Sequence, residues 1–453
     1  MERKSFKKPE LWGGLECSYN RVKDHFLDQL LYCGHYQRAA EDIKRIASLG
    51  IRTMRYPVIW ERLHPYPGHA IDWTTVEIPL NALREQDITP IAGLVHHGSG
   101  PVYADLLSPS FAHGLGEFAA RVAKKFPWIE YYTPVNEPLT TARFSALYGF
   151  WFPHRHNDRA FAQALVNELT AVVTAMREIR KVNPNAKLVQ TEDLAKIFST
   201  PHLKYQADFE NHRRWLTWDF LCGKVNRHHP LWEYFIRCGV TKSSLDFFAE
   251  QPCPPDIIGV DYYATSERYL DEALEKYPPS THGANHFEKY ADVEAFRVRH
   301  EERSGIKVLL QECWDRYHIP IAVTECHINC DFENQVRWFS EIRDACTKLS
   351  VRGIEIKAVT AWALFGSFGW NDLLRKAYGD YESGVFDVRS GVPLPTPMAD
   401  YLMSLSKDPG YIHPAENDKG WWREEDRFIF DRYAEEMLIE GSDDDCGRRG
   451  GVD

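Results

Sequence analysis

Eight short apolar runs, rich in β-branched residues, recur along the chain and alternate with amphipathic stretches of helical spacing. A strand followed by a helix, repeated in this way, is typical of βα units around a parallel sheet. The runs expected to form strands are residues 11–17, 51–58, 89–96, 130–138, 186–193, 256–263, 320–328 and 356–364. The helices expected between them include residues 36–49, 111–126, 161–182 and 332–349.

Eight such units predict an α/β fold, a (β/α)8 TIM barrel built as a single domain with inserted helices and loops. The chain has 453 residues, of which 44% are hydrophobic, and this is ample for one large barrel. A doubly wound open sheet is the competing fold, but it usually has fewer strands and a glycine-rich phosphate turn after the first strand. Gly13 and Gly14 lie too early within the first run to form that turn.

The chain is expected to divide into four segments. Residues 1–10 are a lead-in, 11–410 the catalytic barrel with extra helices around 211–250, and 411–440 an extension that packs on the barrel. Residues 441–453 are acidic and glycine-rich with almost no apolar content, so we expect a disordered tail. The aromatic residues of the extra helices are expected to face the core, and they include Trp215, Trp218, Phe220, Trp232, Tyr234 and Phe235.

The net charge and the composition of the first residues exclude some classes of binding partner. The formal net charge is −11, and Lys and Arg are spread along the chain, so nucleic-acid binding has no electrostatic support. The first residues are charged and no long apolar segment follows them, which predicts neither a secretory signal nor a membrane span and favours a cytoplasmic location.

The ten cysteines are expected to be free and mostly buried, because a cytosolic setting keeps thiols reduced. Cys326, His327 and Cys330 crowd the end of one predicted strand, but no second ligand pair at zinc spacing appears. We therefore interpret them as packing residues. No nucleotide, flavin or metal motif stands out, so no cofactor is expected.

Two glutamates stand where predicted strands end. Glu137 lies in the run 133–138 (TPVNEP), and Glu325 closes the apolar run 321–325 (IAVTE). A barrel gathers the carboxyl ends of its strands at one mouth, which would bring together two residues 188 positions apart. Cleavage of a glycosidic bond needs one carboxyl to protonate the leaving oxygen and another to attack or to activate water. The pair therefore predicts a glycoside-cleaving site.

Other polar and aromatic residues fall at the same strand ends. Each alone is weak evidence, because a single strand-end carboxylate is more often solvated or paired, but the combination favours catalysis. They are Asn20, Arg55, His96, His97, Asn136, Glu192, Asp193, Tyr263 and Trp362.

Motifs from about residue 11 to residue 405 resemble those of glycoside hydrolase family 1, the β-glucosidase-like retaining enzymes. The run 133–138 is similar to the acid/base motif of that family, and 323–325 (VTE) to its nucleophile motif, although Cys326 replaces the usual Asn. Further similar segments are 54–56 (MRY) with 60–62 (WER), 94–96 (LVH), 258–263 (IGVDYY), and 361–364 (AWAL) followed by 368–370 (FGW).

The resemblance implies a role for each matching residue. Glu325 would be the nucleophile, kept ionised by Arg55 and oriented by Tyr263. Glu137 would be the acid and later the base, protonated at rest because Glu325 is ionised beside it. Sugar-binding roles would fall to Asn136 at the 2-hydroxyl, His96 at the 3-hydroxyl side, and Asn20, Trp362 and Trp370 around the ring.

The chain departs from the family where the sugar is gripped. Relatives usually carry Gln at the position of Asn20 and Glu at that of Gly369. Losing a hydrogen-bonding Glu costs about 1.5 to 3 kcal/mol if nothing replaces it. We expect Asp372 or Glu192 to reach into the gap, or the substrate to lack a 6-hydroxyl or to carry a substituent there.

The predicted function is a retaining, exo-acting β-glycosidase that hydrolyses a small-molecule glycoside or oligosaccharide, with neither a nucleic acid nor a membrane as partner. Three alternatives stay open: a transglycosidase that uses the same covalent intermediate, a hydrolase of another family of the same barrel clan that cuts chains from within, and a carbohydrate-binding pseudoenzyme. Assembly as a homo-oligomer stays open with each of these functions. The sequence does not separate hydrolysis from transfer, because both need the same two glutamates.

Overall fold

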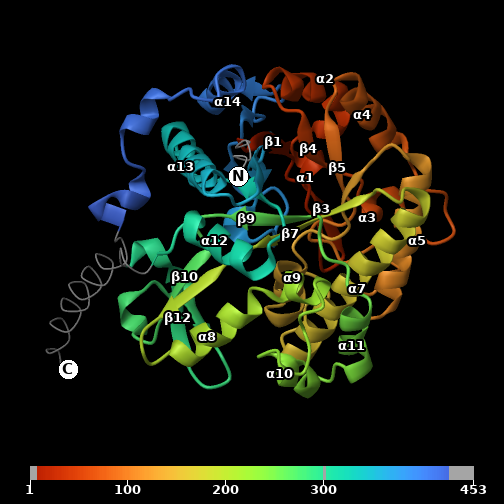
Figure 1. Ribbon diagram of the computed structural model, residues 1–453, viewed down its shortest axis with the longest axis vertical. Helices are drawn as coiled ribbons and strands as arrows, with labels where there is room; N and C mark the ends of the chain where they lie inside the picture. The colour runs from red at the N-terminus through yellow and green to blue at the C-terminus, as the bar shows by residue number, and fades with distance from the viewer. Residues whose placement is uncertain (1–7, 299–302, 428–453) are drawn as a thin grey trace, which may run out of the picture.

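The computed structural model describes residues 8–298 and 303–427, and its centre is a closed barrel of eight parallel strands (Figure 1). Neighbouring barrel strands follow one another along the chain, and the last pairs with the first. The strands are β1 (Glu10–Gly14), β4 (Thr53–Pro57), β5 (Thr89–Gly93), β6 (Tyr131–Thr133), β7 (Lys187–Asp193), β9 (Ile257–Tyr262), β13 (Ile321–Cys326) and β14 (Ile356–Ala361). The eight predicted strands are thus the eight strands of the barrel, and the predicted fold class is confirmed.

Helices surround the barrel and bury the outer face of its strands. Every residue of β9 and β13 is buried, as expected for parallel strands with helices outside and a filled barrel inside. The covering helices are α2 (His35–Ser48), α4 (Thr74–Glu85), α5 (Ser110–Lys125), α7 (Asp158–Val182), α12 (Ile306–Tyr317), α13 (Phe332–Val351) and α14 (Pro397–Lys407). The close approach of α5 and α7 needs Gly116, since a Cβ there would lie 2.7 Å from the Thr174 side chain.

Additional helices and strands fill the connections. The insertion between β7 and β9 holds α8 (Lys204–Arg213), α9 (Leu216–Leu221), α10 (Trp232–Arg237) and α11 (Lys242–Glu250). Shorter helices are α1 (Gln29–Tyr32), α3 (Trp60–Leu63), α6 (Pro138–Ala142), η1 (Arg143–Leu147), η2 (Leu274–Lys276), η3 (Pro279–Thr281), η4 (Ala295–Arg297), η5 (Trp370–Asp372), η6 (Pro414–Asn417), η7 (Trp421–Arg423) and η8 (Glu425–Arg427). Among the described helices, none is long and apolar enough to cross a membrane.

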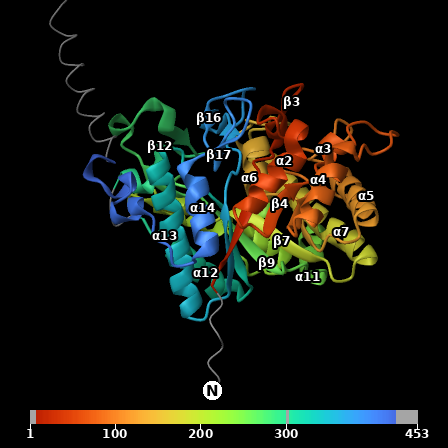
Figure 2. The same cartoon turned by 90° about the horizontal axis from the view of Figure 1, so that it is seen from above.

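The strands outside the barrel form small sheets. One sheet has four strands, β8 (Lys196–Ser199), β10 (Glu267–Asp271), β11 (His282–Ala284) and β12 (Lys289–Glu294). Three hairpins are β2 (Tyr19–Val22) with β3 (His25–Asp28), β15 (Ser367–Phe368) with β16 (Tyr381–Glu382), and β17 (Phe386–Asp387) with β18 (Leu394–Pro395). Figure 2 shows β3, β16 and β17 at one end of the barrel.

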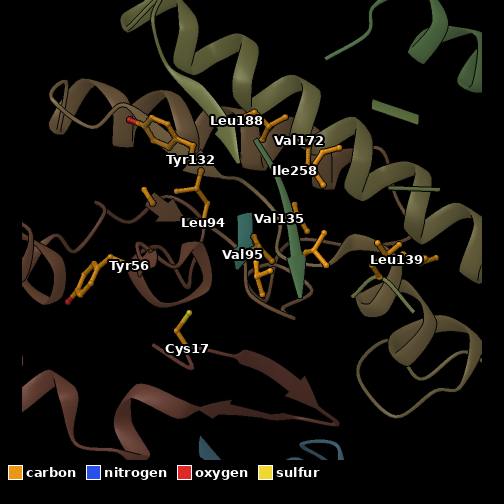
Figure 3. Packing of buried hydrophobic residues seen from close by; sticks show 14 of the residues in the cluster. Cys17, Tyr56, Leu94, Val95, Tyr132, Val135, Leu139, Val172, Leu188 and Ile258 are labelled. Carbon is orange, nitrogen blue, oxygen red and sulfur yellow. The ribbon is translucent and has the colours of Figure 1, made fainter. Parts of the chain in front are cut away.

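The hydrophobic core has an outer and an inner part. The outer part lies between strands and helices, and Figure 3 shows members of it, such as Leu188, Ile258 and Val172. The inner part closes the barrel below its mouth, as the layered side chains of such barrels do, and it comprises Trp12, Ile91, Val189, Ile257, Ala322 and Ala358. Packed side chains therefore fill the barrel interior beneath the mouth.

The segment after α14 contacts the outside of the barrel. Trp422 is buried against Trp338 of α13, with ring centroids 5.0 Å apart, and its indole N–H donates to Glu341 at 3.0 Å. Arg337 donates to the carbonyl of Ala415 at 2.8 Å. The predicted disordered tail, residues 441–453, lies outside the described residues.

Aromatic residues of the insertion contribute to this core. Trp215, Trp218, Phe220, Trp232 and Phe235 are buried in the outer part, and Tyr234 packs against it. The cysteines of the described chain are free, and most of them are buried.

Candidate active site

Backbone pairing beyond the regular strands brings the predicted residues of β5 and β6 together. The amide of Val95 donates to Pro134 at 3.1 Å, the amide of Asn136 donates to Val95 at 2.9 Å, and His96 faces Asn136 across an isolated bridge. Regular β6 ends at Thr133, earlier than the predicted run 130–138; irregular pairing continues to Asn136, and the chain then turns sharply at Glu137, whose φ is 43°. Glu137 therefore stands at the turn between β6, the fourth strand of the barrel, and α6.

Glu192 fixes the helix that follows Glu137. Its carboxylate accepts the amides of Leu139 and Thr140 at 2.8 and 3.2 Å, and the hydroxyls of Thr140 and Thr217 at 2.9 and 2.7 Å. Burial raises the pKa of Glu192 to about 7, although these donors lower it. A carboxylate with four donors has no acceptor site left for a sugar, so Glu192 does not fill the gap in the sugar grip.

Glu325 lies at the end of β13, where the strand register shifts. Between Val323 and Glu325 the pairing with β9 slips by one residue, and Glu325 then faces Asp261. Irregularities of this kind redirect side chains beside active sites. Arg55 donates to one carboxylate oxygen of Glu325 at 2.5 Å, and the hydroxyl of Tyr263 donates to the other.

Arg55 links the nucleophile candidate to the rest of the site. It also donates to the carbonyl of Thr324 at 3.2 Å and to the side-chain oxygen of Asn136, and its guanidinium lies 4.7 Å from the ring centroid of Trp362. Burial alone lowers the pKa of Arg55, but the carboxylates of Glu325 and Asp261 raise it above its ordinary value. A permanent cation therefore stands beside Glu325.

Three carboxyl groups meet at the mouth. Glu137, Asp261 and Glu325 each offer an oxygen within 4.8 Å of the others. Burial raises the pKa of Glu137 well above its ordinary value, and the charges of Asp261 and Glu325 raise it further. Burial and Glu325 also raise the pKa of Asp261. Glu137 is thus held in its protonated form beside a carboxylate that Arg55 stabilises.

The same three carboxyls are the one set in the described chain that is close enough to hold a metal ion. The guanidinium of Arg55 already provides the positive charge beside Glu325. A metal ion is therefore not needed to balance that carboxylate. Cys326, His327 and Cys330 do not come together as ligands within the described residues. The site therefore gives no specific support to metal binding.

Two neighbouring histidines are neutral. Burial lowers the pKa of His97 to about 3, and burial together with His97 lowers that of His96 well below its ordinary value. His96 Nε2 lies 3.2 Å from the amide nitrogen of Asn136, which is a donor, so we assign the ring hydrogen to Nδ1, facing Cys17 Sγ at 3.3 Å. His97 Nε2 lies 3.7 Å from Glu137 Oε2, and its Nδ1 lies 3.1 Å from the hydroxyl oxygen of Thr141.

Asn136 has one amide hydrogen available for a ligand. Its oxygen accepts from Arg55 and from the hydroxyl of Thr191, the latter at 2.7 Å. Its nitrogen faces His96, which uses one of its two hydrogens. The amide is therefore oriented with one donor left over, as the sugar-binding prediction requires.

The aromatic residues of the predicted wall lie beside the two histidines. Trp362 lies parallel to the His96 ring at 5.8 Å, and this placement needs Gly14, because a Cβ there would lie 2.5 Å from the indole. Trp370 meets the His97 ring edge-on at 5.5 Å. Asn20 is fully buried and donates to the carbonyl of Leu374 at 3.1 Å.

Sequence reasoning missed Glu16. Its side chain accepts the amide and hydroxyl of Ser18 at 2.9 and 2.5 Å and the indole N–H of Trp370 at 3.0 Å, and it lies 4.0 Å from His96 Nε2. Burial and the charge of Glu325 raise its pKa to about 7. A signal was present, since Glu16 is an acidic residue inside the apolar run 11–17.

Comparison with known proteins gives one family. Residues 11–382 match the family described as "Glycosyl hydrolase family 1". Beta-glucosidase A of Thermotoga maritima is 21% identical over 381 residues, which cover 77% of this chain and 81% of that protein. A rice protein (Oryza sativa subsp. japonica) called "Probable inactive beta-glucosidase 14" is 28% identical over 162 residues, 34% of this chain and only 31% of that relative.

A solved structure has the same fold. The Thermotoga maritima beta-glucosidase in complex with deoxynojirimycin superposes with a TM-score of 0.72 at 17% identity, covering 90% of this chain and all of that one. At this identity the likeness concerns the fold alone.

Proposed function

Because this chain belongs to glycosyl hydrolase family 1, and so is a glycoside hydrolase, we propose that it is a retaining, exo-acting β-glycosidase. It removes one β-linked sugar from a small glycoside or oligosaccharide by double displacement. Glu325 is the nucleophile, and Glu137 is the acid and then the base. Arg55 and Tyr263 hold the nucleophile in place.

The distance between carboxyl oxygens carries this proposal. Oxygens of Glu137 and Glu325 within 4.8 Å of one another fit the roughly 5 to 5.5 Å between carboxyls in retaining glycosidases. Inverting enzymes need about 6.5 to 9.5 Å, because a water molecule attacks directly from the far side. The short distance leaves room for a sugar carbon and supports attack by Glu325 itself.

In the first step, Glu325 attacks the anomeric carbon while Glu137 gives its proton to the leaving oxygen. The raised pKa of Glu137 keeps that proton available at neutral pH, and Arg55 with Tyr263 orients the carboxylate of Glu325 for attack. The bond to the leaving group breaks, and a glycosyl ester of Glu325 forms.

In the second step, Glu137 is ionised and takes a proton from water, which attacks the same carbon. Formation of the ester removes the negative charge of Glu325, so one cause of the raised pKa of Glu137 disappears at this stage. The bond from the sugar to Glu325 breaks, and the carboxylate returns to Arg55.

Burial of the catalytic groups supports removal of a terminal sugar. Arg55, Glu137 and Glu325 are exposed by only 7%, 4% and 3%. Groups at this depth suit a pocket that takes the end of a chain better than an open groove. Within it, Asn136 binds the 2-hydroxyl, the ring of His96 lines the 3-hydroxyl side with both nitrogens already paired, and Trp362 and Trp370 provide the apolar wall.

The test is release of chromophore from aryl β-glycosides of glucose, galactose, fucose, xylose, mannose and glucuronic acid. We expect release from at least one sugar and none from Glu325→Gln. Silence of the native protein across all six sugars would overturn the proposal and favour a binding-only barrel. Release that persists in Glu325→Gln would remove Glu325 from the nucleophile role.

A further inference from the structure

The residues at the expected sugar-gripping positions offer fewer polar groups than the family pattern does. Asn20 gives one amide hydrogen to the carbonyl of Leu374 and keeps a side-chain oxygen without a partner among the described residues, and Gly369 has no side chain. Asp372 is paired with Arg375 and with Lys376, the latter at 3.1 Å. A hydrolase with an otherwise complete site still needs a group that binds the far edge of the sugar.

Glu16 lies where such a group is needed. It follows β1 at the barrel mouth, only 4% of its surface is exposed, and one of its carboxylate oxygens is held by Ser18 while the other faces Trp370. Trp370, which we place against the sugar, donates its indole N–H to Glu16 Oε2. The charge of Glu325 reaches it strongly enough to raise its pKa.

The side chains of the site form a closed circuit. From Glu325 it runs through Arg55 to Asn136 and His96, and the next group, 4.0 Å away, is Glu16. The circuit returns from Glu16 through three residues, Trp370, His97 and Glu137. Along this circuit Glu16 is three contacts from Glu137 and four from Glu325.

The order of these groups matches the order of carbons in a pyranose. The anomeric carbon lies between the catalytic glutamates, and Asn136 and His96 follow in the order of the 2- and 3-hydroxyls. The next polar group in the circuit, Glu16, then meets the next carbon of the ring, C4.

The hydrogen-bonding capacity of Glu16 fits one hydroxyl. An ionised carboxylate has about four acceptor sites. Ser18 fills two sites on Oε1 and Trp370 fills one on Oε2, which leaves one site on Oε2. These donors also fix the carboxylate, so it is held ready before a sugar arrives.

We propose that Glu16 binds the 4-hydroxyl of the terminal sugar and supplies the carboxylate that is missing at Gly369. This inference rests on the proposed glycosidase function and adds to it the residue that selects the sugar. A hydroxyl at C4 in the correct orientation donates to Glu16 Oε2, and a sugar without it leaves a buried carboxylate oxygen unsatisfied.

The experiment compares kcat/KM for two 4-nitrophenyl β-glycosides: the sugar that ranks first among the six tested above and its 4-deoxy analogue. A hydrogen bond to a carboxylate predicts that the native protein prefers the 4-hydroxy substrate about 10- to 100-fold. In Glu16→Gln the charge is gone, and the preference is expected to fall at least about fivefold.

Glu61→Gln is the matched control. Glu61 is also buried at the barrel mouth, its pKa is raised by burial to about 7, and it accepts the amide of Gly100 at 2.9 Å, but it is not part of the circuit. This variant should keep the full preference for the 4-hydroxyl, whatever it does to the absolute rate.

Three results would count against the inference. The native protein could cleave both substrates equally well, or Glu16→Gln could keep the native preference, or Glu61→Gln could lose it to the same extent. The native comparison needs no variant, so a Glu16→Gln protein that does not fold leaves a decisive measurement. A native protein silent on all six sugars instead overturns the proposed function, and this inference falls with it.

Discussion

Replacing Glu137 by Gln should separate substrates by their leaving groups. The structure holds Glu137 protonated among Asp261, Glu325 and the neutral His97, so an uncharged amide of the same shape fits without leaving a new buried charge. Gln cannot give up a proton. The substitution therefore removes the acid and leaves the nucleophile and its partners in place.

The expected magnitude follows from what the leaving group needs. General acid catalysis contributes about 10²- to 10⁴-fold, so kcat/KM for an alkyl β-glycoside, whose leaving oxygen is strongly basic, should fall by about that factor. A dinitrophenyl glycoside leaves without a proton, and its kcat/KM should fall less than about tenfold. Because kcat/KM reports the first irreversible step, slow breakdown of the glycosyl ester does not affect this comparison.

Glu192→Gln serves as the control. Glu192 is a buried strand-end carboxylate that fixes α6 behind Glu137, so its loss should misplace the acid and the surrounding site together. We expect its effect to depend less on the leaving group. Equal losses on both substrates in Glu137→Gln would refute the acid role of Glu137.

Three further predictions concern the neighbours of the catalytic pair. Tyr263→Phe removes one of two hydrogen bonds to Glu325 and should lower kcat/KM for the best aryl glycoside about 10- to 100-fold, without a large change in unfolding temperature; an unchanged rate would contradict the contact. Asp261→Asn removes a charge that raises the pKa of Glu137. Activity is lost as pH rises through that pKa, so the alkaline limb of the pH–kcat/KM profile should move to lower pH. A shift to higher pH would contradict the coupling of Asp261 to Glu137. Arg55→Met breaks a buried ion pair and should lower the free energy of unfolding by about 3 to 5 kcal/mol in a denaturant titration, whereas unchanged stability would mean that Glu325 is not held as a buried anion.

The barrel could be predicted because each of its strands is locally visible. A parallel strand buried on both faces is a continuous apolar run, and β9 and β13 are such runs. The strand ends were less predictable. The run ending at Pro138 loses regular pairing after Thr133, and the backbone turns at Glu137. The local sequence does not predict that turn.

The meeting of Glu137 and Glu325 at the barrel mouth was predictable, because each lies in a motif at a strand end. It was not predictable where a contact depends on distant segments. Glu16 meets Trp370 from the other end of the chain, a separation of 354 residues, and only the closure of β1 against β14 brings the two segments together. Glu192 shows the opposite case, since it lies at a strand end as expected but its carboxylate is taken up by the start of α6.

The central claim is that Glu325 forms a covalent bond with the sugar. The direct measurement is mass spectrometry of proteolytic peptides after incubation with a 2-deoxy-2-fluoro aryl β-glycoside of the preferred sugar, which slows release of the intermediate. We predict one added fluoroglycosyl group, on the peptide that contains Glu325, and none in Glu325→Gln. A label on Glu137, Asp261 or Glu16, or steady turnover of the parent glycoside with no covalent label on any peptide, would contradict the account.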